Sequence, residues 1–429
     1  MGAIALKLVA RAAGRVLALG LSAALGCSGG VLVGVGGAHA DEARSEQWQL
    51  GALDARDAWK VSTGRGVIVA VIDSGVDASH PDLDGQVLPG VDLVDPGAGN
   101  QGQFDPVGHG TTVAALIAGS SRDNAGAEGI APGAKILPIR VLDKANKYDD
   151  PGVVAQALRW AVDHHASVIN LSLGGALRSE AIAGALQYAA AHDVVVVACT
   201  GNIATDTSIH QVWYPAREPG VVAVAGLGAM AGARGTGSQS SETLWSGSLT
   251  GPETVLAAPA VNLIGAKPGG GYWQVQGTSF AAPLVAGAAS LVRARFPKMS
   301  AANVINRLIG TAKDLGPRGR DDRFGYGEVD PAAALRTDVG EVSDNPLTET
   351  IGQAEHVQTA PAPVDGPMRP GGAAPMPSAS AEPELQQQLA SDGREQVSAV
   401  AGLTAMLLIL VAGAVGVLFH NRRRGKHSL

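Results

Sequence analysis

The sequence predicts an α/β fold with a mainly parallel central sheet. Five short apolar runs are continuous rather than alternating, which is typical of strands covered on both faces. Helical patterns lie between several of these runs, and strands that alternate with helices are the pattern of an α/β domain with right-handed crossovers. The predicted strands are residues 67–72, 136–142, 168–173, 194–198 and 221–225, and the predicted helices are residues 111–118, 153–165, 180–192 and 281–294.

Length and composition limit the classes of protein that this chain can belong to. The 429 residues are 46% hydrophobic and carry a formal net charge of -7, which fits one large domain or two with appendages. Because no stripe of basic residues runs through a domain, we expect no nucleic acid partner. The two cysteines are Cys27 and Cys199, and Cys27 lies in a segment that we expect to be removed. No intramolecular disulfide is therefore expected in the mature chain.

The first 40 residues have the pattern of a secretory signal peptide. Lys7, Arg11 and Arg15 precede an apolar stretch at residues 16–35, and the small-x-small sequence Ala38-His39-Ala40 precedes a cleavage site before Asp41. The apolar stretch is longer than usual, so an uncleaved anchor is the alternative. A lipoprotein site at Cys27 is less favoured, because an apolar branched residue is missing three positions before it.

Residues 397–419 predict a C-terminal transmembrane helix. They contain no charged residue, and as a helix they would span roughly 35 Å, enough for a hydrocarbon core of about 30 Å. Residues 420–429 form a basic tail, which the positive-inside rule places in the cytoplasm. A buried core helix is the alternative. The intervening body then faces the outside of the cell.

The remaining segments follow from composition. Residues 41–65 form a short lead with Trp48 and Trp59, too short to fold alone, which we expect to pack on the body at residues 66–336. Residues 337–396 are rich in Pro, Ala, Glu and Gln without periodicity, which predicts a disordered stalk. Its mean reach as a flexible coil is roughly 40–45 Å.

Four polar residues lie at predicted strand ends or helix starts. Asp73 directly follows the first strand, His109 opens a helix and Asn202 follows the strand at 194–198. Ser279 precedes an alanine-rich helix, where free N–H groups and the helix dipole favour a developing negative charge. Each residue alone has an ordinary structural interpretation as a turn or cap. Together, at the edge where α/β sheets bind ligands, they favour a catalytic site.

The motifs around these residues resemble those of the subtilisin-like serine proteases, over residues 48–336. The order Asp, His, Asn, Ser is also that of the family. The matching motifs are Val71-Ile72-Asp73-Ser74-Gly75-Val76-Asp77, His80-Pro81-Asp82-Leu83, Gly108-His109-Gly110-Thr111, Val168-Ile169-Asn170-Leu171-Ser172-Leu173-Gly174-Gly175, Gly201-Asn202 and Gly277-Thr278-Ser279-Phe280-Ala281-Ala282-Pro283. The resemblance implies a three-layer α/β fold around the mainly parallel sheet.

The resemblance also implies a role for each matching residue. Ser279 would be the nucleophile, His109 the general base, and Asp73 the residue that orients the imidazole. Asn202 would donate its amide to the oxyanion together with the Ser279 N–H.

Substrate binding is implied for a second group of residues. The strand edge Ser172, Leu173 and Gly174 would pair with an extended polypeptide, with residues 142–146 as the opposing rim. Residues 172–175 and 198–201, which include Gly201, would form the walls of the first specificity pocket. The sequence does not predict the floor of that pocket.

Within the family, the layout is similar to the mycosins, proteases of type VII secretion. The core starts close to the cleavage site, the lead contains Gln47-Trp48 and Ala58-Trp59, and a Pro-rich stretch precedes the transmembrane helix. The expected function is a membrane-anchored endopeptidase that cleaves extracytoplasmic polypeptides, with a secretion complex as partner. A general degradative subtilase and a scaffold with dispensable proteolysis are the alternatives.

Two features depart from this pattern or leave the ligand set open. Mycobacterial mycosins carry disulfides that this chain cannot form, so packing must hold its extension and loops. No cofactor is expected. The carboxylates of residues 143–150 could hold calcium but lack the spacing of a calcium loop, so a solvated rim is the preferred interpretation. Cys199 is interpreted as a small buried residue.

Overall fold

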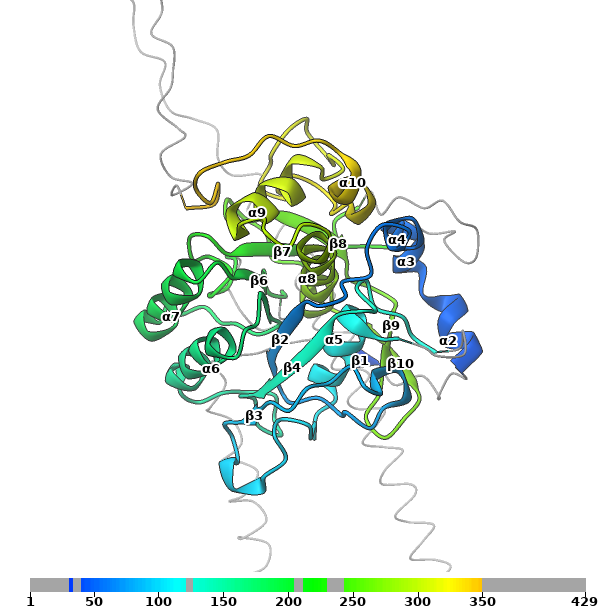
Figure 1. Cartoon of the computed structure of the whole chain (residues 1–429), viewed down its shortest axis with the longest axis vertical. Coiled ribbons are helices and arrows are strands. Elements are labelled where there is room, and N and C mark those ends of the chain that lie inside the picture. Colours follow the sequence, from blue (N-terminus) through cyan, green and yellow to red (C-terminus); the bar gives the residue numbers. More distant parts are fainter. Residues whose placement is uncertain (1–30, 34–39, 121–125, 204–210, 230–242, 349–429) are drawn as a thin grey trace, which may run out of the picture. The chain divides into compact units, whose positions relative to one another are not determined.

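A seven-stranded sheet forms the centre of the structure, a computed structural model that describes residues 31–33, 40–120, 126–203, 211–229 and 243–348 (Figure 1). The strand order is β3-β4-β2-β5-β6-β7-β8, and every neighbouring pair is parallel. The strands are β2 (Ile68–Asp73), β3 (Val91–Asp92), β4 (Lys135–Arg140), β5 (Val168–Leu171), β6 (Val195–Cys199), β7 (Val222–Leu227) and β8 (Leu256–Pro259).

Helices cover both faces of this sheet. In Figure 1 the sheet lies between one pair of helices, α6 and α7, and a second pair, α5 and α8. This arrangement is the predicted three-layer α/β fold, and the described residues all belong to one compact unit. The helices of the body are α5 (His109–Ala118), α6 (Pro151–Asp163), α7 (Glu180–Ala191), α8 (Thr278–Arg295), α9 (Ala301–Gly310) and α10 (Pro331–Arg336), with the short 3-10 turns η1 (Pro81–Leu83) and η2 (Pro96–Ala98).

The five apolar runs form β2, β4, β5, β6 and β7, with boundaries shifted by one or two residues. Strands β5, β6 and β7 are buried along their whole length, which explains why the sequence shows continuous apolar runs there. The sequence analysis missed β3, β8 and a separate antiparallel sheet of order β1-β10-β9. The last sheet consists of β1 (Val31–Val33), β9 (Leu263–Ala266) and β10 (Tyr272–Gln276). Strand β10 was not predicted because polar glutamines interrupt its apolar pattern.

The lead at residues 41–65 packs on the body, as expected. It contains α2 (Ala40–Glu46), α3 (Trp48–Ala52) and α4 (Ala55–Trp59). Leu50 and Leu53 join the main hydrophobic core. The two tryptophans fasten the lead by donating indole N–H groups to backbone carbonyls, Trp48 to Val261 at 3.0 Å and Trp59 to Ile130 at 2.8 Å. When an indole N–H reaches an acceptor, the apolar ring can be buried without loss of a hydrogen bond.

The structure differs from the prediction at the start of the stalk. Residues 337–348 lie against the body instead of leaving it at residue 337. The amide of Asn303 pairs with the backbone of Val342, and Leu347 is buried with its carbonyl accepting from Gly220 N. These contacts depend on side chains far away in the sequence, so the local composition did not reveal them.

The predicted signal peptide and transmembrane helix fall mostly outside the described residues, which include only residues 31–33 and 40 of the first and none of the second. Within the described ranges, no helix has the length and apolarity needed to cross a bilayer. Residues 31–33, inside the predicted signal peptide, form β1 and pair antiparallel with β10.

Candidate active site

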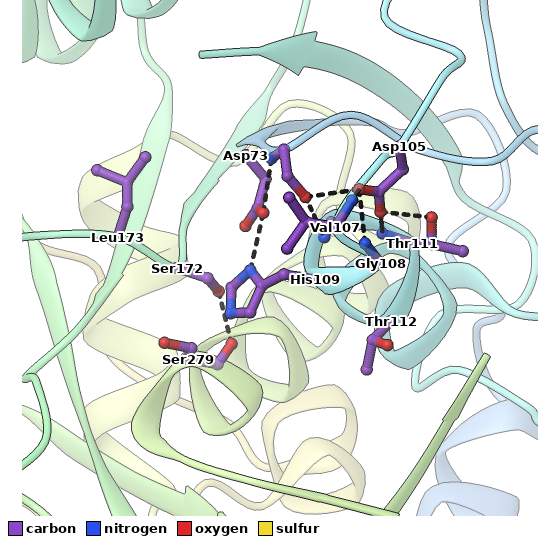
Figure 2. A network of polar contacts seen from close by, with 12 residues as sticks. Asp73, Asp105, Val107, Gly108, His109, Thr111, Thr112, Ser172, Leu173 and Ser279 are labelled. Atoms are coloured by element: carbon purple, nitrogen blue, oxygen red, sulfur yellow. Dashed lines mark hydrogen bonds and ion pairs between the residues drawn. The ribbon is translucent and has the colours of Figure 1, made fainter. Parts of the chain in front are cut away.

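The candidate site lies at the carboxyl end of β2, where two helices begin. Asp73 is the last residue of β2. His109 is the first residue of α5, and Ser279 is near the start of α8, directly after Thr278. Because α5 and α8 pack against each other beside the sheet, residues separated by about two hundred positions converge there (Figure 2). The edge is the one at which open parallel sheets bind ligands.

Asp73 and His109 form a buried ion pair. The Oδ1 atom of Asp73 lies 2.8 Å from Nδ1 of His109, and both side chains are excluded from solvent. Burial of the imidazole acts to lower its pKa, but the charge and hydrogen bond of Asp73 and the charge of Asp105 outweigh it, so the pKa of His109 is raised. The carboxylate therefore fixes a proton on Nδ1, which leaves Nε2 as the nitrogen that can accept one.

The start of α8 holds the backbone of Ser279 in an unusual way. Gly277 precedes the helix at φ 145°, a conformation that favours glycine. Pro283 lies inside the helix and has no N–H to donate to the carbonyl of Ser279, four residues earlier. Ser172 Oγ donates to that carbonyl instead, at 2.6 Å. The side chain from the end of β5 thus replaces the missing helical hydrogen bond.

The hydroxyl of Ser279 does not hydrogen-bond to His109 in this structure. Its Oγ lies 3.9 Å from Sγ of Cys199, and His109 Nε2 is buried without a hydrogen-bond partner among the described residues. The next residue, Phe280, contacts the imidazole, with ring centroids 5.1 Å apart. Figure 2 shows the imidazole between the Asp73 carboxylate and Ser279. Hydrogen bonds of this kind are often long or misaligned before a substrate binds.

Asn202 is anchored to the start of α8. Its Oδ1 accepts from the backbone N–H and the hydroxyl of Thr278, each at 2.9 Å. A backbone N–H can only donate, so the atom facing it must be the amide oxygen, and this fixes the orientation of the Asn202 amide. The nitrogen end of that amide is the one that can donate to an oxyanion.

The predicted substrate-binding residues lie around the ends of β5 and β6. Ser172, Leu173, Gly174 and Gly201 are all buried in the folded chain. Trp213, which the sequence analysis did not single out, lies between the two glycines. A Cβ built on Gly174 would lie 3.3 Å from the Cβ of Trp213, and one built on Gly201 would lie 2.4 Å from its indole.

The surroundings of Cys199 and of the carboxylates at residues 143–150 indicate structural roles. Burial raises the pKa of the Cys199 thiol to about 11, so it is neutral near pH 7 and a poor competitor for nucleophilic attack. Asp143 accepts from Ala145 N and Lys147 N within its own turn, and Asp150 caps α6. In the part of the chain that the structure describes, no group of three or more His, Cys, Asp or Glu side chains is placed to hold a metal ion.

Asp105 is a second residue at this site, besides Trp213, that was not predicted from the sequence. It is buried four positions before His109, and its charge is one of the causes of the raised pKa of the imidazole. An Asp just before a helix start is a recognised capping signal. That signal was available in the sequence, but it did not distinguish Asp105 from an ordinary cap.

Comparisons with known proteins agree with this geometry. The model of the subtilase family matches residues 64–327. Fervidolysin of Fervidobacterium pennivorans is 38% identical over 325 residues, which are 70% of this chain and 45% of fervidolysin, so the chain spans less than half of that relative. Subtilisin DY of Bacillus licheniformis is 36% identical over 266 residues, or 62% of this chain and 88% of subtilisin DY.

The solved structures lead to the same family. MycP3, a protease from the type VII (ESX-3) secretion system, superimposes with a TM-score of 0.58 and 31% identity over 68% of this chain and 88% of MycP3. This chain belongs to the subtilase family, whose model covers residues 64–327. The resemblance to the mycosins is confirmed as a likeness in sequence and fold.

Proposed function

We propose that this chain is a serine endopeptidase that uses Ser279 as nucleophile, His109 as general base and Asp73 as the residue that orients the imidazole. The observation that carries the proposal is the buried Asp73–His109 pair, whose second imidazole nitrogen has no hydrogen-bond partner in the described part of the chain and lies beside the N-terminus of α8. A buried base next to a hydroxyl at a helix start is the arrangement that activates a serine.

The reaction follows from these groups. Rotation of the Ser279 side chain brings Oγ toward His109 Nε2, which takes the hydroxyl proton as Oγ attacks the scissile carbonyl carbon. Asp73 stabilises the imidazolium that forms. The Asn202 amide and the Ser279 N–H donate to the oxyanion. His109 then gives its proton to the leaving amine, and a water molecule, activated by the same imidazole, releases the acyl group.

The substrate is an extended polypeptide bound by backbone pairing. Ser172, Leu173 and Gly174 supply the strand edge, and residues 142–146 supply the opposite rim. Because main-chain hydrogen bonds do not depend on the substrate's side chains, this pairing tolerates many sequences, and selection falls to the pocket near Gly174 and Gly201. The Trp213 indole packs against Gly201 and its Cβ lies near Gly174, which favours small side chains at the position before the cleaved bond.

The cellular setting is a further part of the proposal. We infer a single-pass membrane protein with the catalytic domain outside, and a role in a type VII secretion system. The likeness to MycP1 and MycP3, both from such systems, supports this role. The similarity to fervidolysin, described as a keratinolytic enzyme, supports general degradation as the second candidate.

Cleavage of a proteome-derived peptide mixture tests the proposal. The full-length wild type is expected to cleave peptides, and Ser279→Ala and His109→Ala are each expected to lose on the order of 10⁴- to 10⁶-fold in kcat. A few cleavage sites would indicate a processing enzyme, and many would indicate a degradative one. Equal cleavage by Ser279→Ala and the wild type would disprove the assigned nucleophile.

A further inference from the structure

The carboxylate of Asp105 is buried and hydrogen-bonds to several protein groups. Its two oxygens accept five hydrogen bonds, and among the described residues none of the ion pairs involves it. The donors are Ser74 Oγ at 2.9 Å, Val107 N at 3.0 Å, Gly108 N at 2.7 Å, Thr111 N at 2.9 Å and Thr111 Oγ1 at 2.7 Å. Such a set supplies the buried carboxylate with hydrogen-bond donors in place of water.

These hydrogen bonds fasten the turn that carries His109. The residue before α5 is Gly108, at φ 92°, which has no side chain to cap the helix. Asp105 takes the N–H groups of Gly108 and Thr111 on either side of His109, and Ser74 Oγ takes that of Gly110 at 3.0 Å. Figure 2 shows Asp105 above this turn, with dashed lines to Gly108 and Thr111.

The same network reaches the end of β2. Ser74 donates through Oγ to Asp105 and through its backbone N–H to Asp73 Oδ1, at 2.7 Å. The Asp73 oxygen that accepts from Ser74 is also the one that pairs with His109. One serine therefore connects the two carboxylates near the imidazole.

We propose that Asp105 is a positioning residue for His109, which fixes the first turn of α5 against the Asp73–Ser74 corner and supplies a second negative charge to the imidazole. This proposal rests on the proposed function, since it concerns the same general base. A neutral cap would satisfy the N–H groups of a helix equally well, so the charge is the feature that separates this role from ordinary capping.

The other groups around His109 do not obscure the effect of the Asp105 charge on the pKa of the imidazole. Asp73 faces the imidazole from β2, and Asp105 faces it from the loop before α5. From α8 the neighbours are the neutral Ser279 and Phe280, and from β6 the neighbour of Ser279 is Cys199, whose thiol is neutral near pH 7. Removal of the Asp105 charge therefore lowers the pKa of His109, because a negative neighbour favours the imidazolium.

The test measures how fast a fluorescent fluorophosphonate labels Ser279 in the full-length protein as a function of pH. The label needs the serine and its base but no knowledge of the substrate. For Asp105→Asn we expect the acidic limb of the profile to move to lower pH, because the pKa of His109 falls. We expect the plateau rate to fall on the order of tenfold, because the base loses its fixed position. For Asp105→Glu, which keeps the charge, we expect a lower plateau with the limb of the wild type.

Two further variants separate position from charge. Ser74→Ala keeps both carboxylates but removes their connection, so the plateau should fall while the limb stays in place. Asp330→Asn is the control, because Asp330 also accepts a backbone N–H at a helix start, from Ala333 at 2.8 Å before α10, and none of the ion pairs among the described residues involves it. Both limb and plateau should then match the wild type.

An acidic limb of Asp105→Asn at the wild-type position would overturn the charge effect. If that variant does not fold, a wild-type plateau in Ser74→Ala overturns the positioning role. Labelling that survives in Ser279→Ala would instead disprove the proposed function. Loss of labelling in Ser279→Ala together with a wild-type profile in Asp105→Asn would disprove only the role of Asp105.

Discussion

At the scale of single residues, the side-chain amide of Asn202 has two roles. Its oxygen accepts from Thr278 and so holds the turn before Ser279, while its nitrogen is assigned to the oxyanion. Asn202→Asp separates the two, because the carboxylate keeps an acceptor for Thr278 and loses the donor. We expect kcat to fall by about 10²- to 10³-fold, the loss found for one such donor in subtilisin, with KM little changed.

The control for this prediction is Thr278→Val, which removes the hydroxyl that donates to Asn202 and accepts from Gly201 N, and leaves the backbone N–H bond to Asn202 in place. It should lose far less activity than Asn202→Asp. Steady-state kinetics on one peptide from the cleavage mixture measure both variants. A loss in Thr278→Val as large as in Asn202→Asp would mean that Asn202 serves only the turn.

Trp213 is the second residue whose position makes a specific prediction. Its side chain occupies the space between Gly174 and Gly201, so Trp213→Ala should open the pocket to large side chains. The ratio of kcat/KM for peptides with Phe and with Ala before the cleaved bond should rise at least about tenfold, the scale of discrimination by pocket size. Trp48→Ala, which removes a tryptophan from the lead, should leave this ratio unchanged. An unaltered ratio in Trp213→Ala would place the pocket elsewhere.

At the scale of elements, the close approach of α5 to the end of β2 is the contact that the site depends on. A Cβ on Gly110 would lie 2.1 Å from the carbonyl oxygen of Gly75, so Gly110→Ala must push the helix away from the Asp73 corner. Such a shift of His109 by about 1 Å can reduce kcat on the order of 10²-fold. Labelling by the fluorophosphonate and thermal unfolding should both show the loss.

Gly184→Ala in α7 is the matched control for this contact. Both glycines lie in helices, but the nearest atom to a Cβ on Gly184 is an Arg159 nitrogen at 3.8 Å. Alanine is the better helix former by about 1 kcal/mol, so this variant should be as stable as the wild type or more stable, with full activity. Equal behaviour of the two variants would contradict the tight packing of α5.

The sequence predicted the buried parallel strands because their apolar runs are a local consequence of coverage on both faces. It also predicted Asp73, His109 and Ser279, since the ends of such strands and the starts of helices converge on one edge. Trp213 and the Ser172 hydrogen bond to Ser279 could not be predicted, because each depends on chain segments brought together only by folding. The same reason explains why residues 337–348 pack on the body.

At the scale of the whole molecule, the predicted anchor makes a separate prediction. A chain ended after residue 396 lacks the apolar segment 397–419 and should move from the membrane fraction to the soluble fraction after cell breakage. Because the described domain contains the whole candidate site, fluorophosphonate labelling should persist in the shortened chain. The full-length Ser279→Ala variant, which is expected in the membrane fraction, is the control for fractionation. Membrane retention of the shortened chain would contradict the C-terminal anchor.

The central claim is that Ser279, His109 and Asn202 act on one carbonyl carbon. The most direct measurement is a crystal structure of the protein after reaction with diisopropyl fluorophosphate. We predict phosphorus bonded to Ser279 Oγ, the phosphoryl oxygen within hydrogen-bonding distance of the Asn202 amide nitrogen and Ser279 N, and His109 Nε2 directed at the phosphoryl group. An adduct on another residue, or a phosphoryl oxygen directed away from Asn202, would contradict the account.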